Sequence, residues 1–226
     1  MIIARFALVI IVGYLMGAIP FGLLISRRSA KVDIREYGSG KTGATNVLRT
    51  VGRKAAALVV ILDLLKGTLT VVFAGFIVGR GYLIVGDVGL GLLTGQVLAA
   101  LAAMAGHNWS VFLKFRGGRG VATFFGGLAA LSPGAALFAG EIALIGAVLT
   151  RFASLGSLAG AISAYVILVL LTIINGSPIE YLGYALVGAV TIIVMHRDNI
   201  VRLISGTERR LGEKAEDVEP PPARER

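Results

Sequence analysis

The sequence contains no cysteine and few charged residues. Without cysteine, disulfide bonds and thiolate metal sites are excluded, and the only two histidines, His107 and His196, are too far apart in sequence to show metal-ligand spacing. Only 15% of the 226 residues are charged, whereas 56% are apolar and the mean hydropathy is +0.83. A soluble domain of this length could not cover its surface with so few charges. The composition therefore predicts an integral membrane protein, and we expect neither a metal nor a cofactor.

Seven apolar segments predict an all-α, polytopic membrane protein, because about 20 residues suffice for a helix to cross a bilayer. The segments are residues 2–25, 55–78, 88–104, 121–131, 134–150, 158–174 and 179–195. The fourth is shorter than a normal span and is either a short tilted helix or half of a re-entrant hairpin. The first carries only Arg5 and lacks a clear cleavage site, so we interpret it as a retained helix and not a signal peptide. We assign residues 1–212 to one membrane domain and residues 213–226 to a disordered, acidic and proline-rich tail.

Positive charge predicts the orientation of these helices. The net charge of +9 would suggest nucleic acid as the partner of a soluble protein. In a membrane protein it indicates topology and anionic lipids or substrates instead, so we expect no nucleic acid. In the seven-helix layout all lysines and arginines except Arg5, Lys66 and Arg80 lie in segments on one side. The positive-inside rule places that side in the cytoplasm, with the N-terminus outside and the C-terminus inside.

A polar, glycine-rich stretch, GSGKTGATNVLR, runs from Gly38 to Arg49 between two apolar segments. Its glycines let backbone N–H groups turn toward one point, and hydroxyl, amide and cationic side chains accompany them. GSGKT also resembles the end of a nucleotide-binding P-loop, but Arg35 occupies the position of the earlier glycine and no buried strand precedes the stretch. The stretch therefore predicts binding of a phosphate monoester and argues against a nucleotide.

Two further polar segments follow the same logic. In GHNWSVFLKFRGGRGVAT, Gly106 to Thr123, two arginines flank a glycine pair, and guanidinium groups match phosphate oxygens in bidentate geometry. In HRDNIVRLISGTE, His196 to Glu208, a helical repeat places His196 and Asn199 on one stripe, suited to hydroxyl groups or to a phosphate. Glycine-rich segments of membrane proteins can also serve only close helix packing. Packing does not require the neighbouring arginines, so we favour an anion site.

Four segments in this order resemble one family: GSGxxGATNVLR, LDLLKG, GHxxxxFxxFxGGxGVAT and HRxNIxRLxxGTE. They are similar to the bacterial acyl-phosphate:glycerol-3-phosphate acyltransferases, the PlsY family, over about residues 5–212. The resemblance implies a seven-helix enzyme of the bacterial inner membrane whose active site faces the cytoplasm. It implies transfer of a fatty acyl group from acyl phosphate to the 1-hydroxyl of glycerol 3-phosphate, which gives lysophosphatidic acid for phospholipid synthesis. The partners implied are these two substrates, membrane lipids and the soluble enzyme that makes acyl phosphate.

The resemblance also assigns residues. The catalytic set that it implies is Ser39, Arg49, Arg119, His196 and Asn199. The substrate-binding set is Gly38, Gly40, Lys41, Thr45, Asn46, His107, Arg116, Gly117, Gly118, Gly120 and Ser157. His107 has an alternative role as an interface anchor beside Trp109. Lys41 stands where the family usually has asparagine, and Arg116 and Arg119 stand where it usually has lysine, which changes the geometry expected for the phosphate site.

The chemistry of this substrate fits the residues. Acyl phosphate is a mixed anhydride and already activated, so no nucleophilic Ser-His-Asp set is needed. The site must hold two anions together and direct a hydroxyl group at a carbonyl carbon. The base is either His196 or a substrate phosphate. A membrane transporter for an organic phosphate is the rival interpretation, but we find no internal repeat of the kind that transporters show.

Charged residues lie far from both ends of two apolar segments. Asp63 and Lys66 are three residues apart in the second segment, and we expect them to form a mutual pair that fixes helix position or supports the first motif. Glu141 lies midway along the fifth segment, and the sequence offers no explanation for it.

Overall fold

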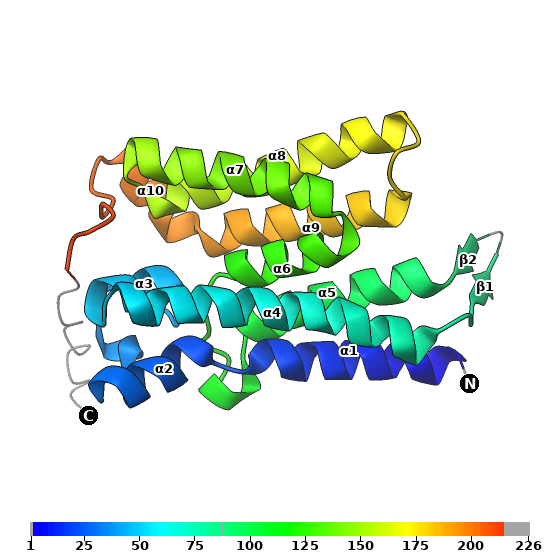
Figure 1. Cartoon of the computed structure of the whole chain (residues 1–226), viewed down its shortest axis with the longest axis horizontal. Helices are drawn as coiled ribbons and strands as arrows, with labels where there is room; N and C mark the ends of the chain where they lie inside the picture. Colours follow the sequence, from blue (N-terminus) through cyan, green and yellow to red (C-terminus); the bar gives the residue numbers. More distant parts are fainter. Residues whose placement is uncertain (1, 87, 215–226) are drawn as a thin grey trace, which may run out of the picture.

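The structure is a computed structural model that describes residues 2–86 and 88–214, and it consists of helices that run along one long axis (Figure 1). The helices of the bundle are α1 (Ile2–Ala18), α4 (Arg53–Val78), α5 (Leu92–Asn108), α6 (Val121–Leu131), α7 (Pro133–Thr150), α8 (Ala153–Ile173) and α9 (Ile179–Met195). The shorter helical elements are α2 (Phe21–Ala30), η1 (Ile34–Glu36), α3 (Ala44–Thr50), η2 (Val111–Leu113) and α10 (Arg197–Ile204). Of these, α2, α3 and α10 lie at one end of the molecule, opposite the first residues of α1 (Figure 1).

Length and apolarity make several of these helices able to cross a membrane. Four candidates in the described chain are each long and apolar enough to cross a membrane. They are the α1–α2 pair, counted as one, and the single helices α4, α7 and α8. A fifth results if α9 and α10, which are bent by 61°, count as one span. Large apolar side chains face outward on these helices, such as Phe76, which is 80% exposed, and Leu149, which is 78% exposed. Such a surface suits lipid and not water, and the prediction of an integral membrane protein is confirmed.

The helices form two groups with α6 between them (Figure 1). One group contains α1, α4 and α5, and the other contains α7, α8 and α9, while α6 packs against α4 and α5 of the first group and against α7 and α9 of the second. Phe124 of α6 stacks on Tyr184 of α9 with ring centroids 5.3 Å apart, and the tyrosine hydroxyl donates to the Phe124 carbonyl at 2.8 Å. The short helix, expected as a half-length element, is therefore buried in protein, and its first turn is held at a fixed place between the two groups.

Glycine permits the closest approach between α1 and α5. A Cβ atom on Gly106 would collide with the backbone carbonyl of Tyr14, and one on Gly17 would collide with that of Ala103. The packing role that glycine often has in membrane helices is thus real in this bundle. Gly67 and Gly126 allow the same close approach between α4 and α6, and Gly156 allows it between α7 and α8. The glycines of the two polar loops have other roles described below.

The first apolar segment differs from the expectation of one helix over residues 2–25. It breaks between α1 and α2 because Pro20 has no N–H group and cannot continue the helix. Two carbonyl groups freed by the break find donors elsewhere: Ser110 Oγ donates to Ala18 O at 2.6 Å, and Lys66 Nζ donates to Ile19 O at 3.1 Å. Polar side chains from α4 and from the end of α5 therefore hold this break together.

The expectation of a wholly helical chain is also corrected. Residues 83–85 and 88–90 form an antiparallel hairpin, β1 (Leu83–Val85) and β2 (Val88–Leu90), at the end of the molecule where α1 begins (Figure 1). β-branched residues favour strands, and Gly86 adopts a positive φ of 60° in the turn. The third span, expected from residue 88, consequently begins only at Leu92.

Two boundaries near the C-terminal half differ as well. The turn expected over residues 151–157 is short, because Arg151 ends α7 in a left-handed conformation and α8 starts at Ala153. Ser157 thus lies within a helix. After α10 the chain leaves the helical conformation, and residues 205–214 form an irregular segment that we call the C-terminal strap. The tail expected over residues 213–226 lies, apart from residues 213 and 214, outside the described residues.

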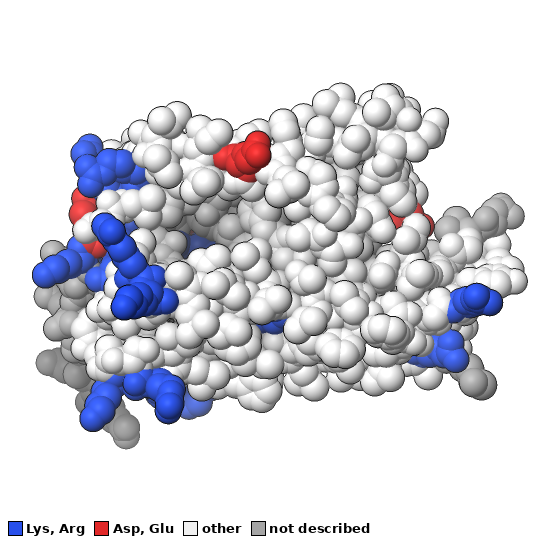
Figure 2. Space-filling model, in the orientation of Figure 1, with Lys and Arg blue, Asp and Glu red and all other residues white. Residues whose placement is uncertain are grey.

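Basic residues gather at the end of the molecule that holds α2, α3 and α10, and few charges occur along its middle (Figure 2). At the other end Arg5 Nη1 donates to the Val78 carbonyl at 3.0 Å and so ties α1 to the end of α4. The asymmetric distribution of charge that the sequence predicted is therefore present in three dimensions.

Candidate active site

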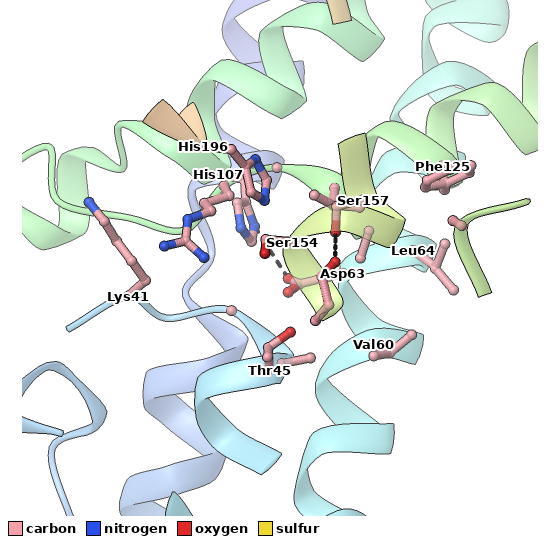
Figure 3. A pocket seen from close by; sticks show the side chains of 18 of the residues that line it. Lys41, Thr45, Val60, Asp63, Leu64, His107, Phe125, Ser154, Ser157 and His196 are labelled. Carbon is pink, nitrogen blue, oxygen red and sulfur yellow. Dashed lines mark hydrogen bonds and ion pairs between the residues drawn. The ribbon is translucent and has the colours of Figure 1, made fainter. Parts of the chain in front are cut away.

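A cavity of about 640 Å³ lies among α3, α4, α6, α7, α8 and the α9–α10 junction. Its two ends differ in character. Polar and charged side chains, among them Lys41, His107 and His196, gather at one end, whereas Val60, Leu64 and Phe125 line the other (Figure 3). The surface is hollowed between the two helix groups, and basic atoms are visible inside the hollow (Figure 2). A ligand that fits this cavity has an anionic head and an apolar body.

The first motif forms a loop that is held in shape by Asn46. Its side-chain nitrogen lies 2.9–3.0 Å from the carbonyl oxygens of Ile34, Tyr37 and Lys41, and its oxygen accepts from the Ser39 N–H at 3.1 Å. Gly40 takes a left-handed φ of 64° within the same loop. Asn46 is 2% exposed, and both ends of its amide are engaged. We therefore assign it the role of positioning the loop, which revises the expected direct contact with substrate.

The second motif folds back on the end of α5. The Gly117 and Gly118 N–H groups donate to the Asn108 and His107 carbonyls at 3.1 and 3.0 Å, and a Cβ atom on Gly118 would collide with the His107 ring. The next glycine, Gly120, has a φ of 77° and begins α6. The first residues of α6 line the cavity, so the positive end of the helix dipole lies at its wall. The glycines bring Arg119 and this helix terminus to the same place.

His196, at the α9–α10 junction, presents one nitrogen to the cavity. Its Nδ1 lies 2.8 Å from the Ile192 carbonyl oxygen, which can only accept, so Nδ1 carries the proton of the neutral ring. Nε2 is then a hydrogen-bond acceptor. Burial, reinforced by the nearby charge of Arg119, lowers the pKa of His196 to about 4. The ring is therefore neutral at physiological pH, and it is suited to accept a hydrogen bond from a hydroxyl group.

The C-terminal strap is tied to the site by Glu208. One of its carboxylate oxygens accepts from Ser154 Oγ at 2.9 Å and from Asn199 Nδ2 at 2.7 Å, and the other pairs with Arg202 at 2.9 Å. Burial raises the pKa of Glu208, but these hydrogen bonds outweigh it and hold the pKa below its ordinary value. Sequence reasoning missed Glu208 as a site residue, although it ends the third motif. It orients Asn199 and closes the polar end of the cavity.

Arg49 connects α3 to the same strap. Its Nη2 donates to the carbonyl oxygens of Arg209 and Arg210 at 2.9 and 3.4 Å, while its buried Nε has no hydrogen-bond partner among the described residues. Burial lowers the pKa of the guanidinium, and the nearby positive charge of Arg209 lowers it further. Part of the hydrogen-bonding capacity of Arg49 is thus left for a ligand.

Three cations at the polar end have no acidic partner within ion-pair distance in the described part of the chain: Lys41, Arg49 and Arg119. Burial, followed by the charge of Arg202, lowers the pKa of Arg119 to about 10, and burial followed by the charge of Arg119 lowers that of Lys41. The Nε atom of Arg119 and the Oδ1 atom of Asn199 are buried and likewise lack partners in residues 2–86 and 88–214. A bound anion relieves the mutual repulsion of these cations and accepts a hydrogen bond from the Arg119 Nε, whereas the Asn199 oxygen is an acceptor and suits a hydroxyl group.

A cluster of buried charged residues lies next to the polar end of the cavity. Lys66 Nζ is 2.8 Å from Asp63 Oδ1, and both side chains are 3% exposed. His107 Nδ1 approaches the same oxygen at 3.6 Å. The pair expected from the sequence is therefore confirmed, and it additionally reaches His107. Asp63 and His107 line the cavity, so the cluster supports the site from beneath.

Most residues expected to form the site meet in this cavity. Those that line it are Ser39, Lys41, Thr45, Asn46, Arg49, His107, Arg119, Gly120, Ser157, His196 and Asn199. Gly38, Gly40, Gly117 and Gly118 shape the two loops without lining the cavity, and Arg116 is exposed outside it. Ser157 Oγ donates to the Ala153 carbonyl at 2.8 Å within α8. The apolar wall, Asp63 and Ser154 are additions that motif spacing did not indicate.

Comparisons with known proteins agree with one another. The family model described as glycerol-3-phosphate acyltransferase matches residues 7–206. The chain is 60% identical to glycerol-3-phosphate acyltransferase 3 of Dehalococcoides mccartyi (strain CBDB1), covering 95% of this chain and 100% of that protein. It is 42% identical to the glycerol-3-phosphate acyltransferase of Thermoanaerobacter pseudethanolicus, with 91% and 96% covered.

The solved structures that match belong to PlsY (YgiH), an integral membrane glycerol 3-phosphate acyltransferase. Its glycerol 3-phosphate form aligns with a TM-score of 0.79 and 37% identity over 92% of this chain and 96% of the other. Its lysophosphatidic acid form aligns with a TM-score of 0.77 and 36% identity over 92% and 95%. The likeness therefore extends over nearly the whole fold.

Proposed function

Because the chain belongs to the glycerol-3-phosphate acyltransferase family, as its motifs predicted, we propose that it transfers a fatty acyl group from acyl phosphate to the 1-hydroxyl of glycerol 3-phosphate. The products are lysophosphatidic acid and phosphate, and the reaction belongs to phospholipid biosynthesis. The observation that carries the proposal is a cavity with an apolar wall at one end and, at the other, three cations that have no acidic partner among residues 2–86 and 88–214.

The cations neutralise two phosphates held close together. Arg49, Arg119 and Lys41 line the polar end, where guanidinium groups can bind phosphate oxygens in bidentate fashion. The N–H groups at the start of α6 add donors without adding charge. Lys41 supplies a third positive charge at this end of the cavity. We assign the phosphate of glycerol 3-phosphate and that of acyl phosphate to this shared set of donors.

We assign binding of the glycerol hydroxyl groups to the neutral polar side chains. His196 Nε2 is an acceptor, and Asn199 is oriented by Glu208 with its Oδ1 free, while Ser39 lies across the cavity on the first loop. The apolar wall formed by Val60, Leu64 and Phe125 receives the acyl chain. Head and chain are thus held at the two ends of one cavity.

The reaction itself requires one bond to form and one to break. The 1-hydroxyl oxygen attacks the acyl carbonyl carbon, the bond from that carbon to the phosphate oxygen breaks, and the hydroxyl proton leaves with phosphate. A substrate phosphate serves as the base, because His196, with a pKa of about 4, is a weak base better suited to orient the hydroxyl group. Correct placement of two reactants can lower a barrier by about 7–11 kcal/mol. Positioning and charge neutralisation are therefore the main contributions of the protein.

We place the protein in the bacterial cytoplasmic membrane with seven spans, the first made of α1 and α2 together and the fourth formed by the short α6. The basic end, with α2, α3 and α10, faces the cytoplasm and the β1–β2 hairpin faces outward, in accord with the positive-inside rule. This is also the side from which a soluble enzyme that makes acyl phosphate would deliver it. A reporter fused after Arg226 should be active only on the cytoplasmic side, and activity on the outer side would reverse the topology.

The decisive assay supplies palmitoyl phosphate and glycerol 3-phosphate to the purified protein in detergent or liposomes. Lysophosphatidic acid should form without an added thioester, metal ion or ATP. Absence of product, with a folded protein, would remove acyl phosphate as the donor. Transport of glycerol 3-phosphate into sealed liposomes, the rival function, should not occur, since apolar side chains line the end of the cavity opposite the cations.

A further inference from the structure

One glycine in the membrane bundle is required neither by its backbone conformation nor by helix packing. Gly140 lies in the interior of α7, seven residues after Pro133 and ten before Thr150. Its backbone is helical, so no positive φ calls for glycine. Glycine inside a helix is less favourable than alanine, because it loses more conformational freedom on folding. The reason for glycine at this position therefore lies outside the helix itself.

The glycines at the contact between α7 and α8 have a packing reason that Gly140 lacks. A Cβ atom on Gly156 would collide with the Ala143 carbonyl oxygen, and one on Gly146 would lie 3.3 Å from the Gly156 Cα atom. At Gly140, no heavy atom of the described chain beyond its own helical turn lies within 4 Å of the place of a Cβ. A larger side chain would therefore fit there without disturbing the bundle.

The space beside Gly140 belongs to the cavity assigned to the substrates. The residues of α7 that line this cavity are Pro133, Ala136, Leu137, Gly140 and Ala143. At about 100° per residue these positions form one stripe along the helix, and Gly140 lies at the centre of the stripe. A side chain at position 140 would project into the cavity, so glycine keeps the cavity wide at this point.

The apolar end of the cavity lies between α4, α6 and α7. Val60 and Leu64 of α4 and Phe125 of α6 line it together with the α7 stripe (Figure 3). Helices α4 and α7 each pack on α6, but among the described helices these two are not a closely packed pair. Leu137 lines the cavity and is nevertheless 70% exposed, so the cavity opens toward lipid beside α7. A chain lying between α4 and α7 can continue from there into the membrane.

Gly140 lies partway along the path that such a chain would follow. Ser154 and Ser157, on α8, are at the polar end, and the α7 stripe leads away from them from Ala143 to Pro133. By the helix rise this stripe is about 15 Å long, and Gly140 is about 5 Å along it. A side chain added at Gly140 would meet a long acyl chain over most of its length and a short chain much less.

Resting on the proposed acyl transfer, we propose that Gly140 determines the acyl-chain specificity of the enzyme. The missing side chain keeps the α7 wall flat, so that a long, unbranched chain lies between α4 and α7 and its far end reaches lipid past Leu137. The donors selected are therefore long-chain acyl phosphates. A bulky residue at this position would compete with the chain for the same space, as overpacking does in a protein core.

A matched pair of variants tests this role. Gly140→Leu fills the space beside the chain, and Gly134→Leu is the control, because Gly134 is on the same helix and has open space at its Cβ but does not line the cavity. The full chain is assayed in liposomes with palmitoyl phosphate or octanoyl phosphate as the donor. The ratio of kcat/KM for palmitoyl over octanoyl phosphate should fall about tenfold in Gly140→Leu and stay within about twofold of wild type in Gly134→Leu. An unchanged ratio in Gly140→Leu, or equal falls in the two variants, would overturn the proposal.

A smaller substitution keeps the test decisive if leucine prevents folding. Gly140→Ala adds one methyl group and favours the helix, so this variant should fold. Its ratio of palmitoyl to octanoyl kcat/KM should fall as well, by a smaller factor than with leucine. A ratio that stays the same or rises in Gly140→Ala would refute a contact between the chain and this wall.

Binding measurements separate the role of Gly140 from the proposed reaction. Glycerol 3-phosphate should raise the melting temperature of wild type, Gly140→Leu and Gly134→Leu alike, since neither substitution touches the cations at the polar end. Palmitoyl lysophosphatidic acid should raise the melting temperature of Gly140→Leu less than that of wild type. If wild type gave no product from either donor, the proposed reaction would fail. Equal shifts by palmitoyl lysophosphatidic acid in wild type and Gly140→Leu would instead overturn the role of Gly140.

Discussion

Two groups of charged side chains are buried or half-buried in this protein, and they differ in whether the chain itself provides the opposite charge. In the first group Asp63 pairs with Lys66, and Glu208 pairs with Arg202. In the second group Lys41, Arg49 and Arg119 lack an acidic partner at ion-pair distance in the described residues. A buried charge with a built-in partner serves the fold, because breaking the pair leaves an uncompensated charge. A cluster of like charges without partners opposes the fold, and the proposed anion site accounts for it.

Breaking a member of the paired group should have the largest effect on stability. Asp63→Ala leaves the Lys66 ammonium unpaired inside the bundle and should lower the free energy of unfolding by about 3–5 kcal/mol. The measurement is unfolding in detergent followed by circular dichroism. The double variant Asp63→Ala, Lys66→Met should recover most of the loss, since no charge is then left alone. If the Asp63→Ala variant were as stable as wild type, the distinction between the paired and the unpaired group would not hold.

Breaking a member of the unpaired group should affect turnover and not stability. Arg119→Ala should lower kcat by about 10²–10³, the loss typical of one charge-stabilising donor, while the melting temperature stays equal or rises as repulsion falls. Arg116→Ala is the matched control three residues away, because Arg116 is exposed outside the cavity. It should lower kcat by less than about tenfold. Equal losses in the two variants would mean that the cavity does not identify the functional arginine.

Glu208 sharpens the comparison because it is paired and also orients a site residue. Glu208→Gln keeps the shape but gives up the negative charge that three donors share, so unfolding should become easier by about 1.5–3 kcal/mol. Asn199 loses its fixed orientation as well, and the KM for glycerol 3-phosphate should rise several-fold. Steady-state kinetics and thermal unfolding check both effects. A change in stability without a change in KM would confine Glu208 to the fold.

The smallest effect concerns pH. The pKa of His196 is about 4 in the folded protein, so the ring should not titrate between about pH 7 and 9, where the substrate phosphates are also fully charged. The kcat profile should therefore show no inflection from His196 in this range. The unfolded chain takes up this proton at the ordinary pKa of about 6.5, so stability should be lost as the pH falls from about 6.5 toward 4. A profile that rises through a histidine-like pKa near 7, and is lost in His196→Asn, would contradict the neutral ring.

The sequence allowed most of the architecture and much of the site to be predicted. Apolar runs located α6 and α9 at the residues where the structure has them, because lipid demands continuous apolar helices. The break at Pro20 was within reach of sequence reasoning, since proline interrupts a helix, but its stability depends on donors from Lys66 and Ser110 far along the chain. Such long-range contacts leave no local pattern.

For the site, the motifs identified which residues would gather but not how their roles divide. Asn46 and Arg116 both have side chains of the kind that bind ligands. The Asn46 amide, however, is hydrogen-bonded within its own loop, and Arg116 is exposed outside the cavity. Glu208 ends the third motif, and only the fold shows that it orients Asn199. The residues of the apolar wall are of the same types as those that face lipid, so the sequence alone could not distinguish them.

The most direct test of the account is the stabilisation of the protein by glycerol 3-phosphate, measured as the shift in melting temperature of wild type and of Arg119→Ala. A ligand that binds only the folded state raises its stability in proportion to the logarithm of its concentration. The account predicts a clear shift for wild type and little or none for Arg119→Ala, although the free variant is at least as stable as free wild type. Equal shifts in the two proteins would contradict the claim that the unpaired cations form the anion site.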